Sequence, residues 1–394
     1  MIAVDGELQA PKLREPDLPR TAKVRTGPLR TGWTTGACAA AAAKAAAFLL
    51  DGRPPPAEVD IPLPEPFAGS DRATFSVDRS DSGQDWAEAV VVKDAGDDPD
   101  VTDKASVTVR LERVAASGVD FVAGPGVGTV TLPGLGLEVG GPAINPVPRA
   151  MIRAAVGEVL DLDDVGVRCT VSVPGGEAMA RKTTNARLGI LGGISILGTT
   201  GVVRPFSTAS WQASVEQAIG VMAAQGHATA VLSTGGRTER AARTLLPDLP
   251  ELCFVEVGDF TGAALRRAVE HGMTNVVFVG MAGKLAKLAG GILMTHYTRS
   301  KVDLDLLAQV TAEAGGEPAA VAEVRLANSA RHVYELWDHH GVVGASDRLC
   351  DRVEDVLIAF SGGALAAAVA MVDFTSLALA GRSRSWPGEA ASSA

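Results

Sequence analysis

Residues 227–291 read HATAVLSTGGRTERAARTLLPDLPELCFVEVGDFTGAALRRAVEHGMTNVVFVGMAGKLAKLAGG. In this stretch short apolar runs alternate with longer amphipathic segments, and glycine, proline or aspartate stands at most of the junctions. The pattern predicts strands at 228–233, 252–257 and 275–280 and helices at 237–245, 260–271 and 282–290. Strands that are separated by single helices pair in parallel, and helices cover both faces of the resulting sheet. We therefore expect an α/β domain around this stretch.

Further helical segments flank the alternation. They are predicted at 207–225, 303–314, 317–326, 330–339 and 347–360. The most apolar late stretch, 363–380, is interrupted by Asp373 and bounded by glycine and arginine. It therefore indicates a buried helix-strand segment rather than a membrane span.

The chain before residue 174 mixes helices and strands. A threonine-capped, alanine-rich helix is predicted from about Gly36 to Leu50, and two prolines open a second helix from Pro146 to about Leu160. Apolar alternation predicts strands at 73–77, 87–93, 106–114 and 165–173. Residues 174–206 are rich in glycine, threonine and basic residues without clear periodicity, which is typical of functional loops.

The length of 394 residues exceeds one ordinary core and predicts two domains. We expect an N-terminal α+β domain at 29–205 and a C-terminal α/β domain at 206–380. The ends, 1–28 and 381–394, have the composition of flexible tails.

Composition excludes several classes of protein. The net charge of −10 argues against a nucleic-acid-binding surface, because phosphate contacts need a basic face. The four cysteines form no CxxC pair, so neither a zinc site nor a disulfide framework is expected and we expect no metal site. The N-terminus shows no secretion signal and no segment predicts a membrane span, so we expect a cytoplasmic protein.

Common catalytic motifs are missing from the sequence. There is no HExxH, GxSxG, GxxxxGK[ST] or GxGxxG, and the nearest approach to a phosphate loop, GMAGK at 280–284, has the wrong spacing and is followed by Leu285 instead of a hydroxyl residue. Methyl transfer from a sulfonium needs mainly orientation and exclusion of water. The missing motifs agree with a methyltransferase, although they do not identify one, and they name no catalytic residue.

A donor site is predicted at the ends of the three strands. The first strand is followed by a glycine turn at a helix N-terminus, Glu256 and Asp259 lie at the end of the second strand, and Lys287 follows the third. Candidate contacts are Thr234, Gly235, Gly236, Asp259, Gly280, Gly283 and Lys284. Acidic groups at this position bind ribose hydroxyls in adenosyl sites. An ordinary turn is the alternative interpretation.

Basic residues concentrate in the connecting segment. Arg181, Lys182, Arg187 and Arg204 lie among glycines and hydroxyl residues, which suits a ligand with several carboxylates. A solvated charged face is the alternative. Arg149 is a candidate anion contact, the acidic stretch 93–100 is a candidate acceptor or a simple turn, and His296 is a lone histidine near the glycine-rich sheet ends.

Five long segments together resemble the cobalt-precorrin-5B C1-methyltransferase family of the anaerobic cobalamin pathway. They are LRTGWTTGACAAAAAKAA at 29–46, VVKDAGDDPDVT at 91–102, GVGTVTLPGLGLEVGGPAINPVPRAMI at 126–152, ARKTTNARLGILGGISILGTTGVVRPFS at 180–207 and GMAGKLAKLAGGILMTH at 280–296. The resemblance runs nearly end to end. The family usually has His-Gly where this chain has Asp103-Lys104, and Asn where it has Asp259.

The resemblance implies S-adenosylmethionine as methyl donor and a cobalt-containing corrinoid as acceptor, with cobalt only as part of the substrate. It implies an N-terminal domain similar to the second domain of ribosomal protein S5 and a C-terminal Rossmann-like three-layer α/β/α domain. The corrinoid contacts expected on this basis are Thr34, Thr35, Arg149, Arg181, Lys182, Thr183, Arg187, Thr199 and Arg204. Two other function classes stay open, a non-catalytic corrinoid-binding protein and a phosphate-transferring enzyme. A homo-oligomeric state also stays open.

Overall fold

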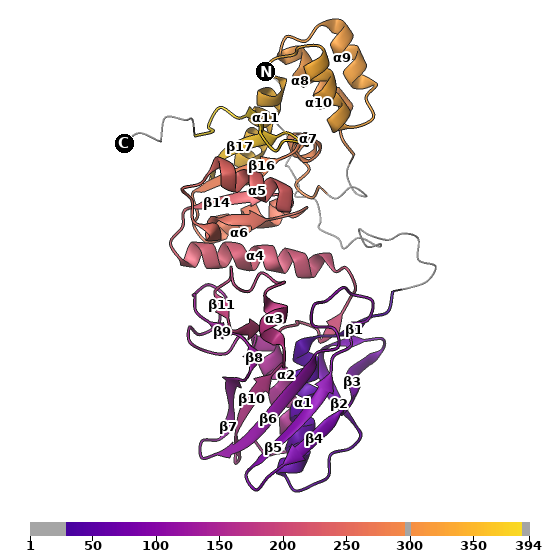
Figure 1. Cartoon of the computed structure of the whole chain (residues 1–394), viewed down its shortest axis with the longest axis vertical. Coiled ribbons are helices and arrows are strands. Elements are labelled where there is room, and N and C mark those ends of the chain that lie inside the picture. The colour runs from indigo at the N-terminus through magenta and orange to yellow at the C-terminus, as the bar shows by residue number, and fades with distance from the viewer. Residues whose placement is uncertain (1–28, 296–300, 388–394) are drawn as a thin grey trace. The chain divides into compact units, whose positions relative to one another are not determined.

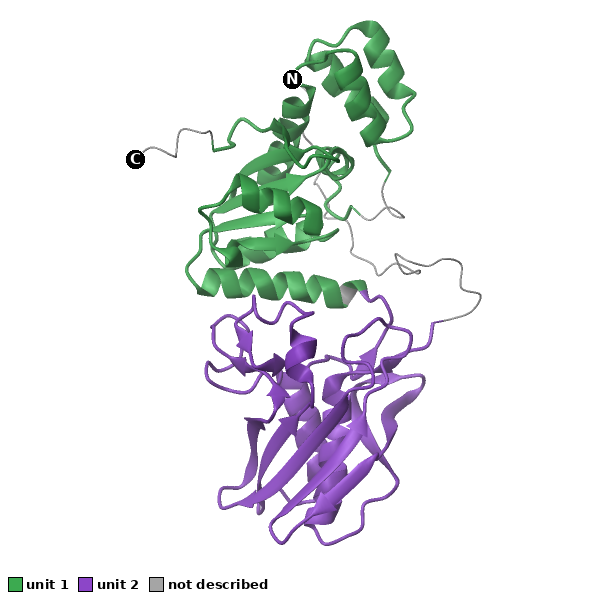
Figure 2. Cartoon of the chain, in the orientation of Figure 1, with its two compact units in different colours: residues 1–16, 208–394 green, residues 17–207 purple. Residues whose placement is uncertain are grey.

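The structure is a computed structural model that describes residues 29–295 and 301–387. The described residues up to Ser207 form one compact unit, and those from Thr208 onward form a second (Figure 2). The predicted tail at 1–28 lies outside the described residues. Each unit is described by itself.

The N-terminal unit contains a five-stranded sheet in the order β4-β5-β6-β10-β7 (Figure 1). Its strands are β4 (Arg79–Ser82), β5 (Trp86–Val92), β6 (Ser106–Val114), β7 (Gly118–Ala123) and β10 (Gly166–Ser172). All neighbours are antiparallel except β10 and β7, which run parallel. Alternate residues of β6, Val107, Val109 and Leu111, are fully buried and form the core with the helices.

Two helices complete this core. Helix α1 (Thr35–Leu50) packs against β5, β6 and the second helix, α2 (Pro146–Gly157). The alanines of α1 are buried all round, because small side chains let the sheet and α2 approach closely. Both predicted helices are confirmed, although α2 ends three residues before Leu160.

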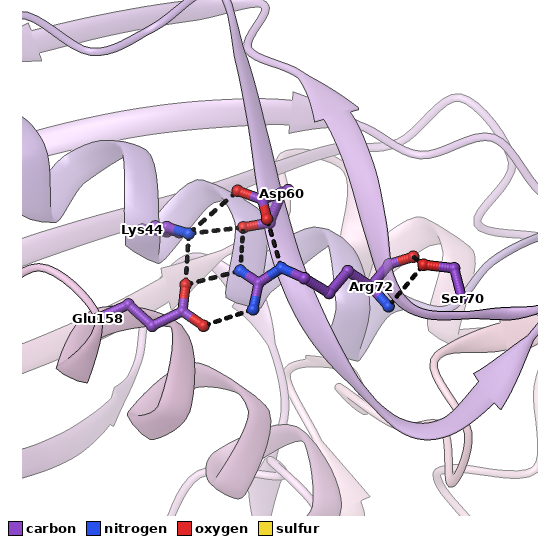
Figure 3. A network of polar contacts seen from close by, with 5 residues as sticks. All are labelled: Lys44, Asp60, Ser70, Arg72 and Glu158. Atoms are coloured by element: carbon purple, nitrogen blue, oxygen red, sulfur yellow. Dashed lines mark hydrogen bonds and ion pairs between the residues drawn. The ribbon is translucent and has the colours of Figure 1, made fainter.

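A long hairpin, β2 (Glu58–Phe67) and β3 (Ser70–Ser76), is joined to both helices by a charged network (Figure 3). The buried Lys44 of α1 donates to Asp60 O at 2.7 Å and pairs with Glu158 at the end of α2 at 2.5 Å. Arg72 of β3 binds Glu158 bidentately, with both N–O distances 2.8 Å, and also pairs with Asp60. The sequence did not predict β2, since its three prolines interrupt the strand pattern and shift the register after Pro62.

The remaining segments of the N-terminal unit are short and lie at one end of it (Figure 1). They are β1 (Gly32–Trp33), β8 (Gly126–Val127), β9 (Thr129–Val130), α3 (Gly176–Ala180), β11 (Ile190–Leu191), β12 (Gly193–Ile194) and β13 (Val202–Val203). Pairing of β1 with β13, β8 with β12 and β9 with β11 ties three distant segments together. Apart from the five-residue helix α3, residues 174–206 thus form loops, as predicted, held by two-residue strands.

The C-terminal unit contains a sheet in the order β15-β14-β16-β17-β18, with four parallel strands and an antiparallel last one. The strands are β14 (Thr229–Ser233), β15 (Phe254–Glu256), β16 (Asn275–Gly280), β17 (Ala366–Val372) and β18 (Leu379–Arg382). The predicted α/β class and its three central strands are confirmed. Residues 363–380 form β17, a turn and part of β18 without a helix, because an alanine-rich run is equally suited to a parallel strand buried on both faces.

Helices cover both faces of this sheet. Val231 of β14 and Val277 of β16 face helix α5 (Gly236–Leu245), whereas Leu232 and Phe278 face the opposite layer. That layer is built from α4 (Thr208–Ala224), α6 (Thr261–Glu270), α7 (Ala282–Ala289) and α11 (Ala345–Phe360). Helices α8 (Leu304–Glu313), α9 (Pro318–Arg325) and α10 (Ala330–His339) pack together and extend the same core, and a short 3₁₀ helix (Glu251–Cys253) precedes β15.

The predicted flexible tail at 381–394 is wrong for its first residues. Strand β18 includes Arg382, and Ser383 exchanges hydrogen bonds with Val369 of β17, at 2.8 and 2.9 Å. Trp386 then packs against the α5 face of the sheet. These contacts hold residues 383–386 against the sheet, although their polar composition resembles that of a flexible tail. Residues 388–394 lie outside the described part of the chain.

Candidate functional site

The carboxyl ends of β14, β15 and β16 meet at one edge of the C-terminal sheet, since the three strands are parallel. After β14 the chain turns through Thr234 and Gly235 into α5. The Thr238 hydroxyl accepts hydrogen bonds from the amides of Thr234 and Gly235, at 3.0 and 3.1 Å, and donates to Gly235 O at 2.8 Å. Thr238 therefore fixes the turn, a role that sequence reasoning missed.

The glycines at this edge fall into two kinds. An added Cβ at Gly236 or Gly283 would meet no atom within 4 Å, so neither position needs glycine for packing. An added Cβ at Gly280 would lie 2.9 Å from Phe278 Cε1, so Gly280 serves close packing. Space is thus left at the first turns of α5 and α7.

Of the two acidic residues at the end of β15, Glu256, the last residue of the strand, lies beside the glycine turn. An added Cβ at Gly235 would be 3.9 Å from Glu256 Oε1. Asp259, only 5% exposed, instead pairs with Lys284 of α7 and accepts from Thr295 Oγ1 at 3.1 Å. The structure thus brings together Asp259 and Lys284, which were both predicted as donor contacts. It also places Glu256 beside the glycine turn.

Thr295 links the two lysines of α7. Lys284 donates to Thr295 Oγ1 at 3.0 Å, and Lys287 donates to Thr295 O at 3.0 Å. Burial, followed by the neighbouring charge of Lys284, lowers the pKa of Lys287. One further polar atom stands out at this edge: Thr261 Oγ1, at the start of α6, is buried with no hydrogen-bond partner among the described residues. His296 itself lies outside the described residues.

In the N-terminal unit, Thr34 and Thr35 hold the loop that follows β12. The Thr34 hydroxyl caps α1 by accepting from the Ala37 amide at 3.1 Å. The Thr35 hydroxyl accepts from the Leu197 amide at 3.0 Å, and the Thr34 amide donates to Gly201 O. Both threonines are buried, so they shape the loop at 197–201 from beneath.

The basic residues and threonines that were predicted as corrinoid contacts in the connecting segment differ in exposure. Arg181, Lys182, Thr183, Thr199 and Arg204 are exposed, whereas Arg187 is half-buried. Thr183 donates to Ala180 O at 2.8 Å and accepts from the Asn185 amide, which closes the turn after α3. The buried Asn185 in turn donates to Gly193 O at 3.1 Å and so supports the basic loop from within.

Arg149 lies in the first turn of α2 and is half-buried. Its Nε donates to Ile144 O at 2.8 Å and its Nη2 to Pro142 O at 3.2 Å, so that the guanidinium is fixed in one orientation. Burial, followed by the nearby charge of Arg153, lowers the pKa of Arg149.

The acidic stretch 93–100 is engaged within its own unit. Arg30 pairs with Asp94, the buried Lys93 pairs with Asp100 at 2.8 Å, and the Phe206 amide donates to Asp98 at 2.8 Å. Burial raises the pKa of Asp98. These contacts agree with the prediction of a turn and join the start of the unit to its end.

No group of three or more histidine, cysteine, aspartate or glutamate side chains within 29–295 and 301–387 is placed to hold a metal ion. All four cysteines are unpaired and buried, and each belongs to a hydrophobic core cluster. In the part of the chain that the structure describes, no helix is both long enough and apolar enough to cross a bilayer.

Two protein-family models match the chain. One, described as CbiD, matches residues 22–205, and another, described as CbiD, C-terminal domain, matches residues 294–383. A curated relative from Salinispora arenicola is 65% identical over 377 residues, which are 95% of this chain and 98% of the relative. The chain belongs to the CbiD family.

Other CbiD relatives agree. A protein of Salinispora tropica is 64% identical over 95% of this chain and 98% of its own, and one of Rubrobacter xylanophilus is 60% identical over 94% and 96%. All three relatives are named cobalt-precorrin-5B C(1)-methyltransferase. The family resemblance read from the sequence is thereby confirmed.

A solved structure also matches, a cobalamin biosynthesis protein (cbiD) from Archaeoglobus fulgidus at 29% identity. The match covers 69% of this chain and 83% of that one, with a TM-score of 0.35. The likeness of the N-terminal unit to the second domain of ribosomal protein S5 stays a prediction.

Proposed function

We propose that this CbiD protein is a C-methyltransferase that methylates C1 of cobalt-precorrin-5B in cobalamin biosynthesis. The observation that carries this conclusion is the 65% identity to a cobalt-precorrin-5B C(1)-methyltransferase over 98% of that relative's length. At such identity and coverage both units are shared with the relative. Cobalt belongs to the substrate and is not a resident metal of the protein.

S-adenosylmethionine is the proposed methyl donor, bound at the carboxyl edge of the C-terminal sheet. The open first turns of α5 and α7 and the unpartnered Thr261 hydroxyl fit a polar ligand there. The turn at Thr234, Gly235 and Gly236 would approach the donor, and Gly280, Gly283, Lys284 and Asp259 would line its other side. Glu256 is better placed than Asp259 to accept hydrogen bonds from the ribose, because it lies beside Gly235.

Corrinoid contacts are proposed on the N-terminal unit. The exposed Arg181, Lys182 and Arg204 and the half-buried Arg149 and Arg187 would bind the carboxylate arms. Thr183 and Thr199 would be surface contacts, whereas Thr34 and Thr35 would act by shaping the loop at 197–201.

The donor supplies a methyl group on a sulfonium, an already activated leaving group. What remains for the protein is to hold the C1 carbon in line with that methyl group and to exclude water. In the transfer a carbon–carbon bond forms at C1 and the carbon–sulfur bond of the donor breaks. No residue of the chain has to form a covalent intermediate, which agrees with the missing nucleophile motifs.

Calorimetry on the full chain separates this function from its alternatives. We expect S-adenosylmethionine and S-adenosylhomocysteine to bind, and ATP not to bind. Tight ATP binding without affinity for S-adenosylmethionine would favour a phosphate-transferring enzyme. Corrinoid binding without affinity for either nucleoside would indicate a carrier protein.

A further inference from the structure

Two arginines of α2 share one aromatic ring in the N-terminal unit. The guanidinium carbon of Arg149 lies 5.4 Å from the centroid of the Phe121 ring, and that of Arg153 lies 4.8 Å from it. Phe121 belongs to β7 and is 8% exposed, whereas Arg153 is exposed. The Phe121 ring therefore packs against both guanidinium groups and limits their orientations at the surface of the unit.

This pair of cations has no ion-pair partner among the described residues. Burial and the charge of Arg153 lower the pKa of Arg149 and outweigh the charge of Glu138, which favours a higher pKa. Neither guanidinium pairs with a carboxylate of the described residues, and Arg153 makes no hydrogen bond to them. Arg149 uses Nε and Nη2 for backbone carbonyls, which leaves its Nη1 hydrogens available. A guanidinium carries five N–H donors, so several donors at this ring point to no protein acceptor.

Four other arginines that lie over aromatic rings are neutralised by a carboxylate. Arg110 lies 4.0 Å from the Trp86 ring centroid and pairs with Glu112 at 3.1 Å. Arg53, Arg243 and Arg331 likewise combine an aromatic ring with a carboxylate partner. Arg237 and Arg266 also lie over rings, those of Phe374 and Phe360, without an ion pair among the described residues. Phe121 is set apart because two arginines without an ion pair share its ring.

The position of Arg149 near the start of α2 is unfavourable for the helix. The first turn of α2 holds no acidic residue, and its cap residue Asn145 makes no side-chain capping hydrogen bond. Arg149, the fourth residue of α2, is close enough to the helix N-terminus to oppose the helix dipole, whereas Arg153, the eighth of twelve, is not. Residues that break such local rules without a structural gain are expected at functional sites.

We infer that Arg149 and Arg153, held over Phe121, form a binding subsite for a carboxylate arm of the corrinoid. Arg153 is the new member of the site, and the inference rests on the proposed function. A planar carboxylate matches the guanidinium fork, and the ring limits the orientations that each fork can adopt. Arg149 acts as the fixed partner and Arg153 as the surface partner.

The test compares Arg153→Gln with the wild-type chain and with Arg110→Gln, a neutralised arginine over a ring of the same unit. The probes are cobyrinic acid, whose arms are free carboxylates, cobinamide, whose arms are amides, and S-adenosylmethionine. We expect Arg153→Gln to weaken cobyrinic acid binding about tenfold, as loss of one charge-assisted contact predicts. Its affinities for cobinamide and the donor should match the wild type, and Arg110→Gln should leave all three unchanged.

A second readout separates binding from a structural role. Arg153→Gln should unfold close to the wild-type temperature, because Arg153 is exposed and makes no hydrogen bond or ion pair with the described residues. Unchanged affinity for cobyrinic acid, an equal loss for cobinamide, or a clear loss of stability would each overturn the subsite. If the wild-type chain itself binds neither cobyrinic acid nor the donor, the proposed function fails instead.

Discussion

At the scale of single residues, Lys104 occupies a backbone conformation that suits glycine. Its φ is 61°, in the left-handed region, and its side chain makes only exposed contacts, 3.6 Å to Asp94 and 3.8 Å to Asp103. The family resemblance implies glycine at this position, and the backbone conformation gives a physical reason for it. Lys104 is thus a point of backbone strain.

Lys104→Gly should raise the free energy of unfolding by about 0.5–1 kcal/mol, because glycine adopts positive φ without steric conflict. Lys104→Ala is the matched control, since it removes the same exposed ion pairs and keeps the strain. Chemical denaturation of the full chain, followed by a probe in the N-terminal unit, measures the difference. Equal stability of the two variants would contradict the backbone argument.

Gly236 gives a second prediction at this scale, directed at the donor site. Because an added Cβ meets no protein atom, Gly236→Ala should change the free energy of unfolding by no more than about 0.5 kcal/mol. The same methyl group would project into the space proposed for the donor and weaken S-adenosylmethionine binding at least about tenfold. Calorimetry measures the affinity, with Gly157→Ala in α2 as the control. Wild-type donor affinity in Gly236→Ala would move the donor site elsewhere.

At the scale of elements, the charged network of Figure 3 fastens the β2–β3 hairpin to α1 and α2. Hydrogen bonds from Arg72 lower the pKa of Glu158 below its ordinary 4.5 and that of Asp60 below its ordinary 3.8. The folded state therefore binds fewer protons than the unfolded state, so the network stabilises above these ordinary values. That contribution is lost as the pH falls from about 4.5 through the lowered values.

Glu158→Gln should release the hairpin and flatten its pH response. We expect faster hydrogen exchange in β2 and β3 at pH 7, corresponding to a loss of about 1–2 kcal/mol, since Lys44 stays buried with fewer partners. The wild-type hairpin should lose protection when the pH falls from 5 to 3, after correction for intrinsic exchange, and the variant should lose less. Identical profiles would show that the network does not hold the hairpin.

The elements also show what a sequence can predict. Amphipathic helices and the strands β14, β15 and β16 follow from periodicity, because each has a polar face or a clear boundary. Strand β17 does not, since an alanine-rich run buried on both faces has no periodicity that separates strand from helix. The prolines of β2 conceal a strand that tertiary contacts to Lys44 and Glu158 secure.

The residues of the candidate site likewise fall into those that the sequence could predict and those that it could not. Asp259 and Lys284 could be chosen because they follow two parallel strands, β15 and β16, and the structure joins them. Thr238 and Arg153 could not, because their roles depend on a hydroxyl folded back on a turn and on a ring supplied by β7. Such contacts depend on tertiary packing, so no local sequence pattern predicts them.

At the scale of the whole molecule, the two units carry different parts of the proposed reaction. The residues proposed for the donor belong to the C-terminal unit, and those proposed for the corrinoid belong to the N-terminal unit. Variants in each should therefore affect one substrate: Gly236→Ala the donor, and Arg153→Gln the corrinoid. A methyl group is transferred only when both the donor and the corrinoid are bound.

The central claim is that this chain transfers a methyl group to one ring carbon. The direct measurement is anaerobic incubation of the full-length protein with cobalt-precorrin-5B and carbon-13-methyl S-adenosylmethionine, followed by carbon NMR of the corrinoid. We predict a single new labelled methyl group, bonded to C1, in an amount equal to the S-adenosylhomocysteine formed. A label on another atom, or no label in the corrinoid while the protein is folded and binds both substrates, would contradict the account.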